Sequence, residues 1–210
     1  MIMNVLAIGA HFDDIELGCG GALAKHAANG DHVTVFVATR SGYVSPDGVV
    51  IRGDEDAEKE GRKAVEILGA KLVCGGLETL SLEFTDDLNA KLVHLIEEEN
   101  IDIIYTHHTG DVHHDHIALA KATLHAARHV PRILTYASNW YLSDQPLVQN
   151  FFVDITDYWD KKEAAIRAHE TEFARAGKDW LTYFKNEDVN NGFRCKVGMA
   201  EGFHCVKWLN

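Results

Sequence analysis

Two short clusters of histidine and aspartate stand out because together they could bind one metal ion. Residues 11–14 read His-Phe-Asp-Asp, and residues 113–116 read His-His-Asp-His. His11 and Asp14 lie three positions apart, so both side chains can reach one ion from a tight turn. Two histidines with one carboxylate form a ligand set that catalytic zinc sites use, and the fourth position stays open for water. The two clusters therefore predict a divalent-metal site.

The same clusters hold groups that would do acid–base chemistry beside the metal. Zinc lowers the pKa of a bound water to about 7, which makes hydroxide available at neutral pH. Asp13 lies beside Asp14 and is placed to accept the proton of that water and to return it to a leaving group. Either His113 or His116 completes the ligand set, and the other stabilises the developing oxyanion. These residues indicate a metal-dependent hydrolase.

Each cluster also has a purely structural interpretation. The acidic residues of the first cluster are typical of a helix N-terminus, and Asp115 is typical of an N-cap. The run Gly18-Cys19-Gly20-Gly21 suggests a dinucleotide site, but that fingerprint should follow the first strand directly and be paired with an acid that ends the second strand. Here residues 11–14 follow the first predicted strand, and the second runs into Thr39-Arg40. We therefore interpret the glycines as positions of close helix–sheet packing.

The place of the two clusters relative to predicted strands is the main reason to combine them. Runs of β-branched and other apolar residues predict strands, and segments with apolar residues at helical spacing separate them. The predicted strands are Asn4–Gly9, His32–Thr39, Lys71–Cys74, Ile101–Thr106, Arg132–Tyr136 and Phe151–Ile155. The predicted helices are Ala22–Asn29, Asp54–Leu68, Asp86–Glu99, Asp115–His129 and Asp157–Ala176, with a loop at Arg40–Gly53. Each cluster thus follows a strand.

Alternating strands and helices predict a Rossmann-like α/β fold. Right-handed crossovers give a mainly parallel sheet with helices on both faces. In the order 3-2-1-4-5, the first and fourth predicted strands are neighbours where the strand order reverses, and ligands bind beyond the carboxyl ends of such strands. The two clusters then face each other. We expect a single domain over residues 1–210, in which residues 177–210 form short strands and a small C-terminal cap beside the pocket.

The composition limits the classes of function. The chain has 210 residues, 46% of them hydrophobic, which suffices for one substantial core. Its formal net charge of -12 argues against a nucleic-acid-binding protein, which normally has a basic face. No apolar run approaches the ~20 residues of a membrane helix, and the N-terminus lacks the features of a signal peptide. With four cysteines and no CxxC pair, we expect free thiols and a cytoplasmic location.

Together the motifs resemble those of the LmbE-like (PIG-L type) zinc-dependent N-deacetylases. The family signature is A-H-P-D-D-x-E, then a glycine cluster and a later H-x-D-H. This chain reads Ala-His-Phe-Asp-Asp-Ile-Glu over residues 10–16 and His-His-Asp-His over residues 113–116, so Phe12 replaces the proline. The resemblance implies removal of an acetyl group from an amino sugar or sugar conjugate of the N-acetylglucosamine type, which releases acetate and an amine. It also implies a small acetylated sugar as the partner, and a homo-oligomer is expected because relatives are often oligomeric.

The resemblance assigns a role to each matched residue. It implies that one Zn²⁺ per chain, or another divalent metal in its place, is bound by His11, Asp14 and His116. It implies that Asp13 acts as the general base and then as the general acid. It implies that His113 steadies the tetrahedral intermediate and that Asp115 hydrogen-bonds within the site, so both belong to the catalytic set.

Substrate contacts are predicted from residue type and position alone. Arg52 and Arg194 can hold a sugar hydroxyl or a phosphate, and the ring of Trp140, after the fifth strand, can stack on a sugar. The alternatives to a sugar deacetylase are a metal-dependent amidase acting on a thiol-sugar conjugate, a phosphoester hydrolase, and a catalytically silent metal- or sugar-binding protein. A two-metal phosphoesterase needs more bridging carboxylates than these clusters supply, and a silent binding protein does not need Asp13 as a proton shuttle.

Overall fold

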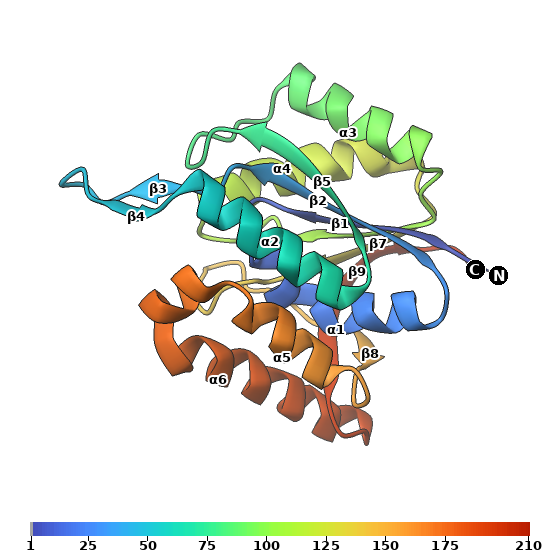
Figure 1. Ribbon diagram of the computed structural model, residues 1–210. Helices are drawn as coiled ribbons and strands as arrows, with labels where there is room; N and C mark the ends of the chain where they lie inside the picture. The colour runs from blue at the N-terminus through green and yellow to red at the C-terminus, as the bar shows by residue number, and fades with distance from the viewer. Residues whose placement is uncertain (1) are drawn as a thin grey trace.

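A seven-stranded sheet forms the centre of the protein (Figure 1), for which the computed structural model describes residues 2–210. The strand order across the sheet is β5-β2-β1-β6-β7-β9-β8. The strands are β1 Asn4–Gly9, β2 His32–Thr39, β5 Lys71–Leu77, β6 Ile103–His107, β7 Arg132–Tyr136, β8 Phe151–Asp154 and β9 Ala200–Trp208. The strands from β5 to β7 are parallel, whereas β9 and β8 add antiparallel pairs at one edge. The predicted α/β class, mainly parallel sheet and 3-2-1-4-5 order are confirmed.

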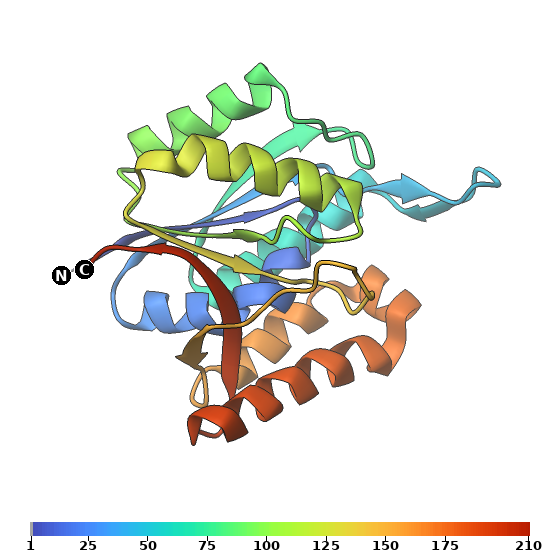
Figure 2. The same ribbon diagram turned by 180° about the vertical axis from the view of Figure 1, so that it is seen from behind.

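Helices cover both faces of the sheet, as predicted (Figures 1 and 2). They are α1 Asp14–Ala28, α2 Asp54–Leu68, α3 Asp86–Glu98, α4 His114–Ala126, the 3-10 helix η1 Ala127–His129, α5 Trp159–Arg167 and α6 Glu170–Cys195. Successive strand residues point to opposite faces. Leu6 and Ile8 of β1 therefore pack with α3 and α4, whereas Val5 and Ala7 pack with α1 and α2. No described helix combines the length and the apolar character that a membrane span requires.

Helix α1 begins at Asp14 rather than at the predicted Ala22, so it includes the glycine-rich segment. Glycine has a low helix propensity, but close packing against the sheet requires it here. A Cβ atom on Gly18 would lie 2.1 Å from the ring of Tyr136. This contact agrees with the interpretation of the glycines as packing positions. The early start of the helix places Asp14 in its first turn.

A kink divides α1 at Cys19, whose φ and ψ angles of -150° and 15° are not helical. The kink leaves backbone N–H groups at the start of the second half without partners inside the helix. The Glu201 carboxylate of β9 accepts the N–H groups of Gly21 and Ala22, at 2.8 and 2.7 Å. The last strand of the sheet thus caps the second half of the first helix.

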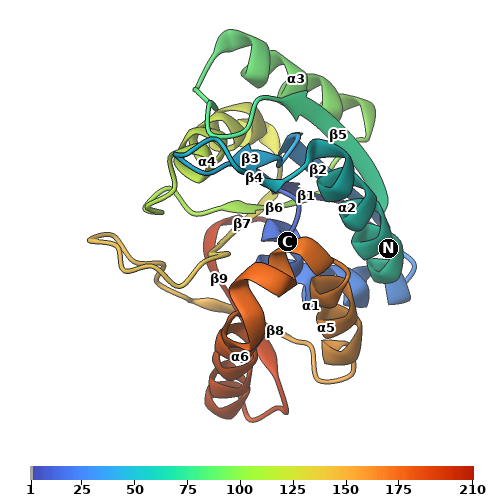
Figure 3. The ribbon, with the colours of Figure 1, turned by 60° about the vertical axis from the view of Figure 1, so that its left-hand side comes forward.

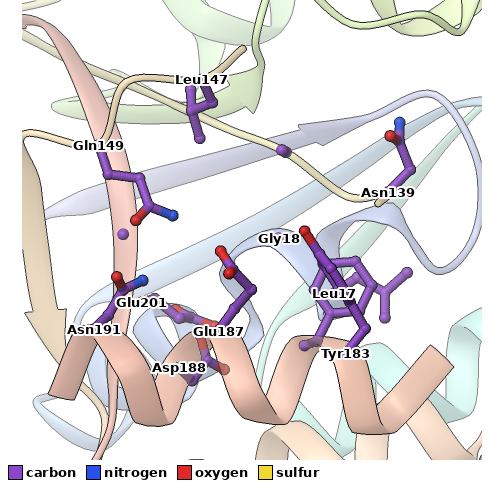
Figure 4. Close-up of a pocket in the computed structure, with 13 residues that line it drawn as sticks. Leu17, Gly18, Asn139, Leu147, Gln149, Tyr183, Glu187, Asp188, Asn191 and Glu201 are labelled. Carbon is purple, nitrogen blue, oxygen red and sulfur yellow. The ribbon is translucent and has the colours of Figure 1, made fainter. Parts of the chain in front are cut away.

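Lys162 of α5 compensates the negative charge of this buried carboxylate. Its ammonium group lies 2.8 Å from Glu201 Oε1 and 2.7 Å from Asp188 Oδ2 of α6, and only 1% of its side chain is exposed. Figure 4 shows Glu201 and Asp188 beside α6, at the base of a small recess. One buried cation therefore balances two buried carboxylates and joins α5, α6 and β9.

The segment after Asp157 differs from the sequence prediction. Instead of one helix over Asp157–Ala176, the chain forms α5 and α6, with His169 between them. The prediction of short strands after residue 177 is wrong, because α6 continues to Cys195 and β9 spans nine residues. Helix α6 packs its apolar residues onto α5 and α1, and such tertiary contacts override weak local signals. It occupies the place beside the pocket where the small cap was expected.

The predicted loop Arg40–Gly53 contains a short hairpin that projects from the body of the molecule (Figure 1). Its strands are β3 (Tyr43–Val44) and β4 (Val50–Arg52). The hairpin turn includes Gly48, whose φ of 80° favours glycine. The base of the hairpin lies at the carboxyl edge of the sheet and brings Tyr43 and Arg52 toward the first histidine cluster.

Replacement of Lys162 tests the buried charge cluster. We expect Lys162→Met to lower the free energy of unfolding by about 3–5 kcal/mol, because the two carboxylates lose their buried cation. The exposed neighbour Lys161 provides a matched control, and Lys161→Met should change stability by no more than about 0.5 kcal/mol. Urea unfolding followed by circular dichroism measures both. A loss below about 1 kcal/mol for Lys162→Met would show that the cluster does not stabilise the fold as described.

Candidate metal centre

The three predicted ligands lie together at the carboxyl edge of the sheet. Strands β1 and β6 are hydrogen-bonded neighbours, so the turn after β1 and the loop after β6 meet there. His11 Nδ1 lies 3.2 Å from His116 Nε2 and 3.4 Å from Asp14 Oδ2. Asp14 Oδ1 lies 3.2 Å from His116 Nε2. In Figure 3 the β3–β4 hairpin, the beginning of α4 and the beginning of α6 gather around the same end of the sheet.

Asp115 fixes the orientation of His11. His11 Nε2 lies 2.9 Å from Asp115 Oδ2. An ionised carboxylate only accepts hydrogen bonds, so Nε2 carries a proton and Nδ1 is the nitrogen that faces Asp14 and His116. The backbone N–H groups of Leu80 and Leu82 donate to the same carboxylate at 2.8 and 2.9 Å. Asp115 therefore acts through His11, in the way that outer carboxylates orient metal-bound histidines.

Asp111, which was not among the residues predicted from the sequence, fixes His116 in the same way. His116 Nδ1 lies 3.1 Å from Asp111 Oδ2, so this nitrogen is the donor and Nε2 faces the centre. Asn139 Nδ2 donates to both Asp111 oxygens at 2.9 Å, and the backbone N–H of His113 donates to Oδ1 at 2.8 Å. The only signal in the sequence is an aspartate after a glycine in the loop that follows β6.

The geometry of the donors fits a zinc ion. With bonds of 2.0–2.1 Å in a tetrahedron, two ligand atoms of one zinc ion lie about 3.3 Å apart. The three pairs formed by His11, Asp14 and His116 are 3.2–3.4 Å apart, although the two contacts of Asp14 use different oxygens. Both histidines turn one nitrogen inward and donate a hydrogen bond from the other nitrogen to an outer carboxylate. These residues are suited to hold one zinc ion, and the ligand assignment itself stays a prediction.

His107 lies behind this set and forms an overlapping group with Asp14 and His116. Its ring stacks on His116 with centroids 4.0 Å apart, and its Nε2 accepts the backbone N–H of Ala10 at 3.1 Å. Burial and the charge of His116 lower the pKa of His107 to about 4, so the ring is neutral. Because that hydrogen bond uses the Nε2 lone pair, this lone pair is not available to a metal ion. We therefore interpret His107 as a residue that packs behind the centre and not as a ligand. His107 was not among the residues predicted from the sequence, because it extends the apolar pattern of β6.

The charges of the centre are strongly coupled. Burial disfavours the charged form of His11, but its hydrogen bonds to Asp115 and Asp14 outweigh this and raise its pKa to about 9. Burial also opposes protonation of His116, but Asp14 and Asp111 raise its pKa to about 10. Burial opposes ionisation of Asp14, but the charge of His116 holds the pKa of this carboxyl well below its ordinary value. Without a metal ion, protons thus occupy the inward side of the centre at neutral pH.

Asp13 lies at the entrance of the centre in a strained conformation. Its φ of 131° is rare for a residue with a side chain, and such strain persists only where the surroundings enforce it. Burial and the neighbouring charge of Asp14 raise the pKa of Asp13 to about 7. A carboxyl group that titrates near neutral pH is suited to take up a proton and to release it again.

The surroundings hold the peptide of Phe12, directly before Asp13, from three sides. The Phe12 N–H donates to Ser41 Oγ at 2.8 Å, and the Phe12 carbonyl accepts from Arg52 Nη1 at 2.9 Å. The Phe12 ring is buried against α2, where a Cβ atom on Gly61 would lie 2.1 Å from it. The residue that replaces the family's proline is therefore part of the fold's core and determines the direction of Asp13.

Arg52 has protein partners in place of the predicted free guanidinium. Besides the Phe12 carbonyl, Arg52 Nη2 donates to Glu60 Oε2 at 3.0 Å and to His169 Nδ1 at 3.2 Å. Glu60 in turn accepts the N–H and hydroxyl of Thr171 at 2.8 and 2.7 Å. Arg52 borders the cavity and is only 3% exposed. These contacts favour a role in holding the turn over the predicted role in substrate binding.

A cavity of about 240 Å³ opens above the centre. Its lining is His11, Asp13, Ser41, Tyr43, Arg52, Thr79, Leu80, His113, Glu172 and Arg175. His113 faces this cavity, and its Nδ1 accepts the backbone N–H of Asp115 at 3.2 Å. Burial and the charge of His116 lower the pKa of His113 to about 4, so its ring is neutral and Nε2 carries a proton that it can donate. His114 is exposed, as expected for the variable position of the motif.

The remaining predicted substrate residues lie elsewhere. Trp140 and Arg194 line a second hollow of about 400 Å³, which also includes Asp111 and Asn139. The hollow therefore adjoins the centre on the side of His116, whereas the first cavity adjoins it on the side of Asp13. The structure does not place Trp140 or Arg194 in the first cavity.

Comparison with known proteins assigns the family. Residues 6–127 match the family model described as PIG-L, GlcNAc-PI de-N-acetylase. The chain belongs to the PIG-L family of LmbE-like deacetylases. The match covers both histidine clusters and most of the parallel sheet, so the resemblance seen in the sequence is confirmed.

Three individual proteins resemble the chain over most of its length. The uncharacterized deacetylase YaiS of Escherichia coli is 35% identical over 183 residues, which are 80% of this chain and 91% of YaiS. The diacetylchitobiose deacetylase of Thermococcus kodakarensis is 26% identical over 98% of this chain and 84% of its own length. The conserved protein TT1542 of Thermus thermophilus has a solved structure with a TM-score of 0.82 at 26% identity, over 100% of this chain and 97% of its own.

The protonated state of the centre predicts the pH dependence of zinc binding. Because the pKa values of His11 and His116 are raised, both rings carry protons at neutral pH, and zinc must displace them. The affinity should therefore rise with pH between 6 and 8, by about tenfold per unit for each displaced proton. Isothermal titration calorimetry in buffers of different ionisation enthalpy measures both affinity and proton release. A pH-independent affinity without proton release would contradict the protonated state of His11 and His116 described above.

The contacts of Arg52 predict whether its replacement changes kcat or KM. We expect Arg52→Met to lower kcat about 10- to 100-fold on any substrate that the enzyme turns over, because the turn at Asp13 is released. The KM should change little, and Ser41→Ala, which removes the other hold on Phe12, should act in the same direction. Arg62→Met, an exposed control on α2, should leave both constants unchanged. A raised KM with an unchanged kcat would instead assign Arg52 to substrate binding.

Proposed function

We propose that this protein uses one zinc ion to hydrolyse the N-acetyl group of an amino sugar or sugar conjugate of the N-acetylglucosamine type. The observation that carries the proposal is the coexistence of a convergent three-donor set with Asp13, a carboxyl group that titrates near neutral pH at the edge of the same cavity. Membership of the PIG-L family and the diacetylchitobiose deacetylase among its relatives support the bond and the substrate class.

The proposed roles divide the residues into those that bind and those that move protons. His11, Asp14 and His116 would hold the zinc ion, which acts as a Lewis acid and lowers the pKa of water at the site. Asp13 accepts the proton of the attacking water and later donates it to the departing amine nitrogen. His113, neutral and facing the cavity, donates a hydrogen bond to the oxygen of the former carbonyl as negative charge develops there.

The cavity is suited to a polar substrate of the size of one sugar ring. Its volume of about 240 Å³ lies below the 300–1,000 Å³ of typical drug-sized pockets. Tyr43, Thr79 and Arg175 supply hydroxyl and guanidinium groups around the rim. Arg175 pairs with Glu172, which also accepts the Tyr43 hydroxyl at 2.9 Å, so these side chains are oriented before a ligand enters.

Acetate release tests the proposed function and the assignment of the base. Zinc-loaded protein should release acetate from N-acetylglucosamine or its conjugates, and Asp13→Asn should lower kcat by about 10²- to 10⁴-fold. The zinc content of Asp13→Asn should stay at one ion per chain, because Asp13 is not among the proposed ligands. Asp157→Asn, at an exposed position, is the matched control.

The other outcomes distinguish the alternatives. Full activity of Asp13→Asn would show that another group is the base. Cleavage of a thiol-sugar amide, with no release of acetate from acetylated amino sugars, would assign the amidase alternative. Binding of zinc and sugar without turnover on either substrate would assign the silent binding protein.

A further inference from the structure

The second hollow, on the His116 side of the centre, has the lining of a sugar-binding site. Its outer part carries the rings of Trp140, Tyr141 and Tyr183, which are 38%, 63% and 39% exposed. The Trp140 ring lies 6.0 Å from each of the two tyrosine rings, between centroids. Rings of this kind offer flat apolar surface together with polar edges. The C–H face of a pyranose ring stacks on such a surface.

The inner part of the same hollow is polar. It narrows into a recess of about 50 Å³, where the side chains of Gln149, Glu187 and Asn191 point toward a common space (Figure 4). Within the part of the chain that the structure describes, no hydrogen bond ties the Gln149 amide or the Glu187 carboxylate to another residue. Amide and carboxylate groups that are not otherwise engaged can bind the hydroxyl groups at the edge of a sugar.

The position of the hollow relative to the metal centre is fixed by hydrogen bonds. Asn139, directly before Trp140, donates to Asp111, the residue that orients His116. The loop that carries Trp140 is also held to the loop after β6, because Ser143 Oγ donates to the Gly110 carbonyl at 2.5 Å and His108 Nε2 lies 2.7 Å from the Gln145 carbonyl. The position of the loop that carries Trp140 therefore does not depend on a bound ligand.

Helix α6 connects the hollow with the first cavity. Arg175 lines the first cavity and Tyr183 lines the second hollow. They are eight positions apart on the helix, which corresponds to about 12 Å along the axis. A molecule longer than one sugar ring can thus occupy both places along the same helix.

We propose that the second hollow is a distal subsite that binds a second sugar ring of the substrate. This inference rests on the proposed function and specifies it: the preferred substrate is an N-acetylated disaccharide or longer saccharide rather than a single sugar. The acetylated ring to be cleaved lies in the first cavity beside Asp13. The next ring stacks on Trp140, with its hydroxyl groups toward Gln149 and Glu187.

Kinetics with two substrates test the subsite. For the wild-type protein, kcat/KM should be higher for N,N′-diacetylchitobiose than for N-acetylglucosamine. We expect Trp140→Ala to lower kcat/KM for the disaccharide about three- to tenfold, mainly through KM, and to leave the monosaccharide value unchanged. Trp140→Phe should restore most of the kcat/KM that Trp140→Ala loses for the disaccharide. Trp208→Ala is the matched control, because Trp208 is 39% exposed and lies away from the hollow, against Phe151 and Arg132.

Equal effects of Trp140→Ala on both substrates, or no effect on either, would overturn the subsite while the proposed function stands. If neither substrate releases acetate, the proposed function fails, and binding alone still decides the subsite. Titration of N,N′-diacetylchitobiose into Asp13→Asn protein, followed by tryptophan fluorescence, should show a change that is lost in the Asp13→Asn, Trp140→Phe double variant and kept with Trp208→Phe. Absence of that difference would overturn the subsite as well.

Discussion

Two histidine nitrogens that face each other constrain the whole site. Asp115 and Asp111 each accept a hydrogen bond from the outer nitrogen of a ring, so the inner nitrogens of His11 and His116 face each other 3.2 Å apart. Two lone pairs at that distance repel unless a cation lies between them, and Asp14 adds negative charge at the same point. A proton or a metal ion must therefore occupy the centre, and the outer carboxylates make it selective for cations.

The fold maintains this arrangement through contacts outside the proposed ligand set. Pairing of β1 with β6 brings the two loops together, and the packing of Gly18 on Tyr136 lets α1 begin close enough to the sheet for Asp14 to reach the centre. Arg52 holds the Phe12 carbonyl and so maintains the strained backbone conformation at Asp13. This conformation points the side chains of Asp13 and Asp14 in different directions. In the proposed mechanism, ligation and proton transfer would fall to neighbouring aspartates, and the unusual φ angle of Asp13 separates their side chains.

The sequence was sufficient for features that local patterns encode. The order of the parallel strands follows from alternating strand and helix signals, and the convergence of His11, Asp14 and His116 follows from that order. The outer residues were not predictable in this way, since Asp111 and His107 belong to the centre only through tertiary contacts. Helix α6 was mispredicted for the same reason, because its length depends on packing against α5 and α1. Arg52 was found, but its partners assign it a different role from the one its residue type suggested.

The most direct test of the account is a crystal structure of the zinc-loaded protein with anomalous data at the zinc absorption edge. The account predicts a single strong peak within about 2.0–2.2 Å of His11 Nδ1, His116 Nε2 and one oxygen of Asp14. In that structure Asp115 and Asp111 should remain hydrogen-bonded to the outer nitrogens of the two rings. A peak coordinated by His107 in place of His11, or no zinc between the two clusters, would contradict it.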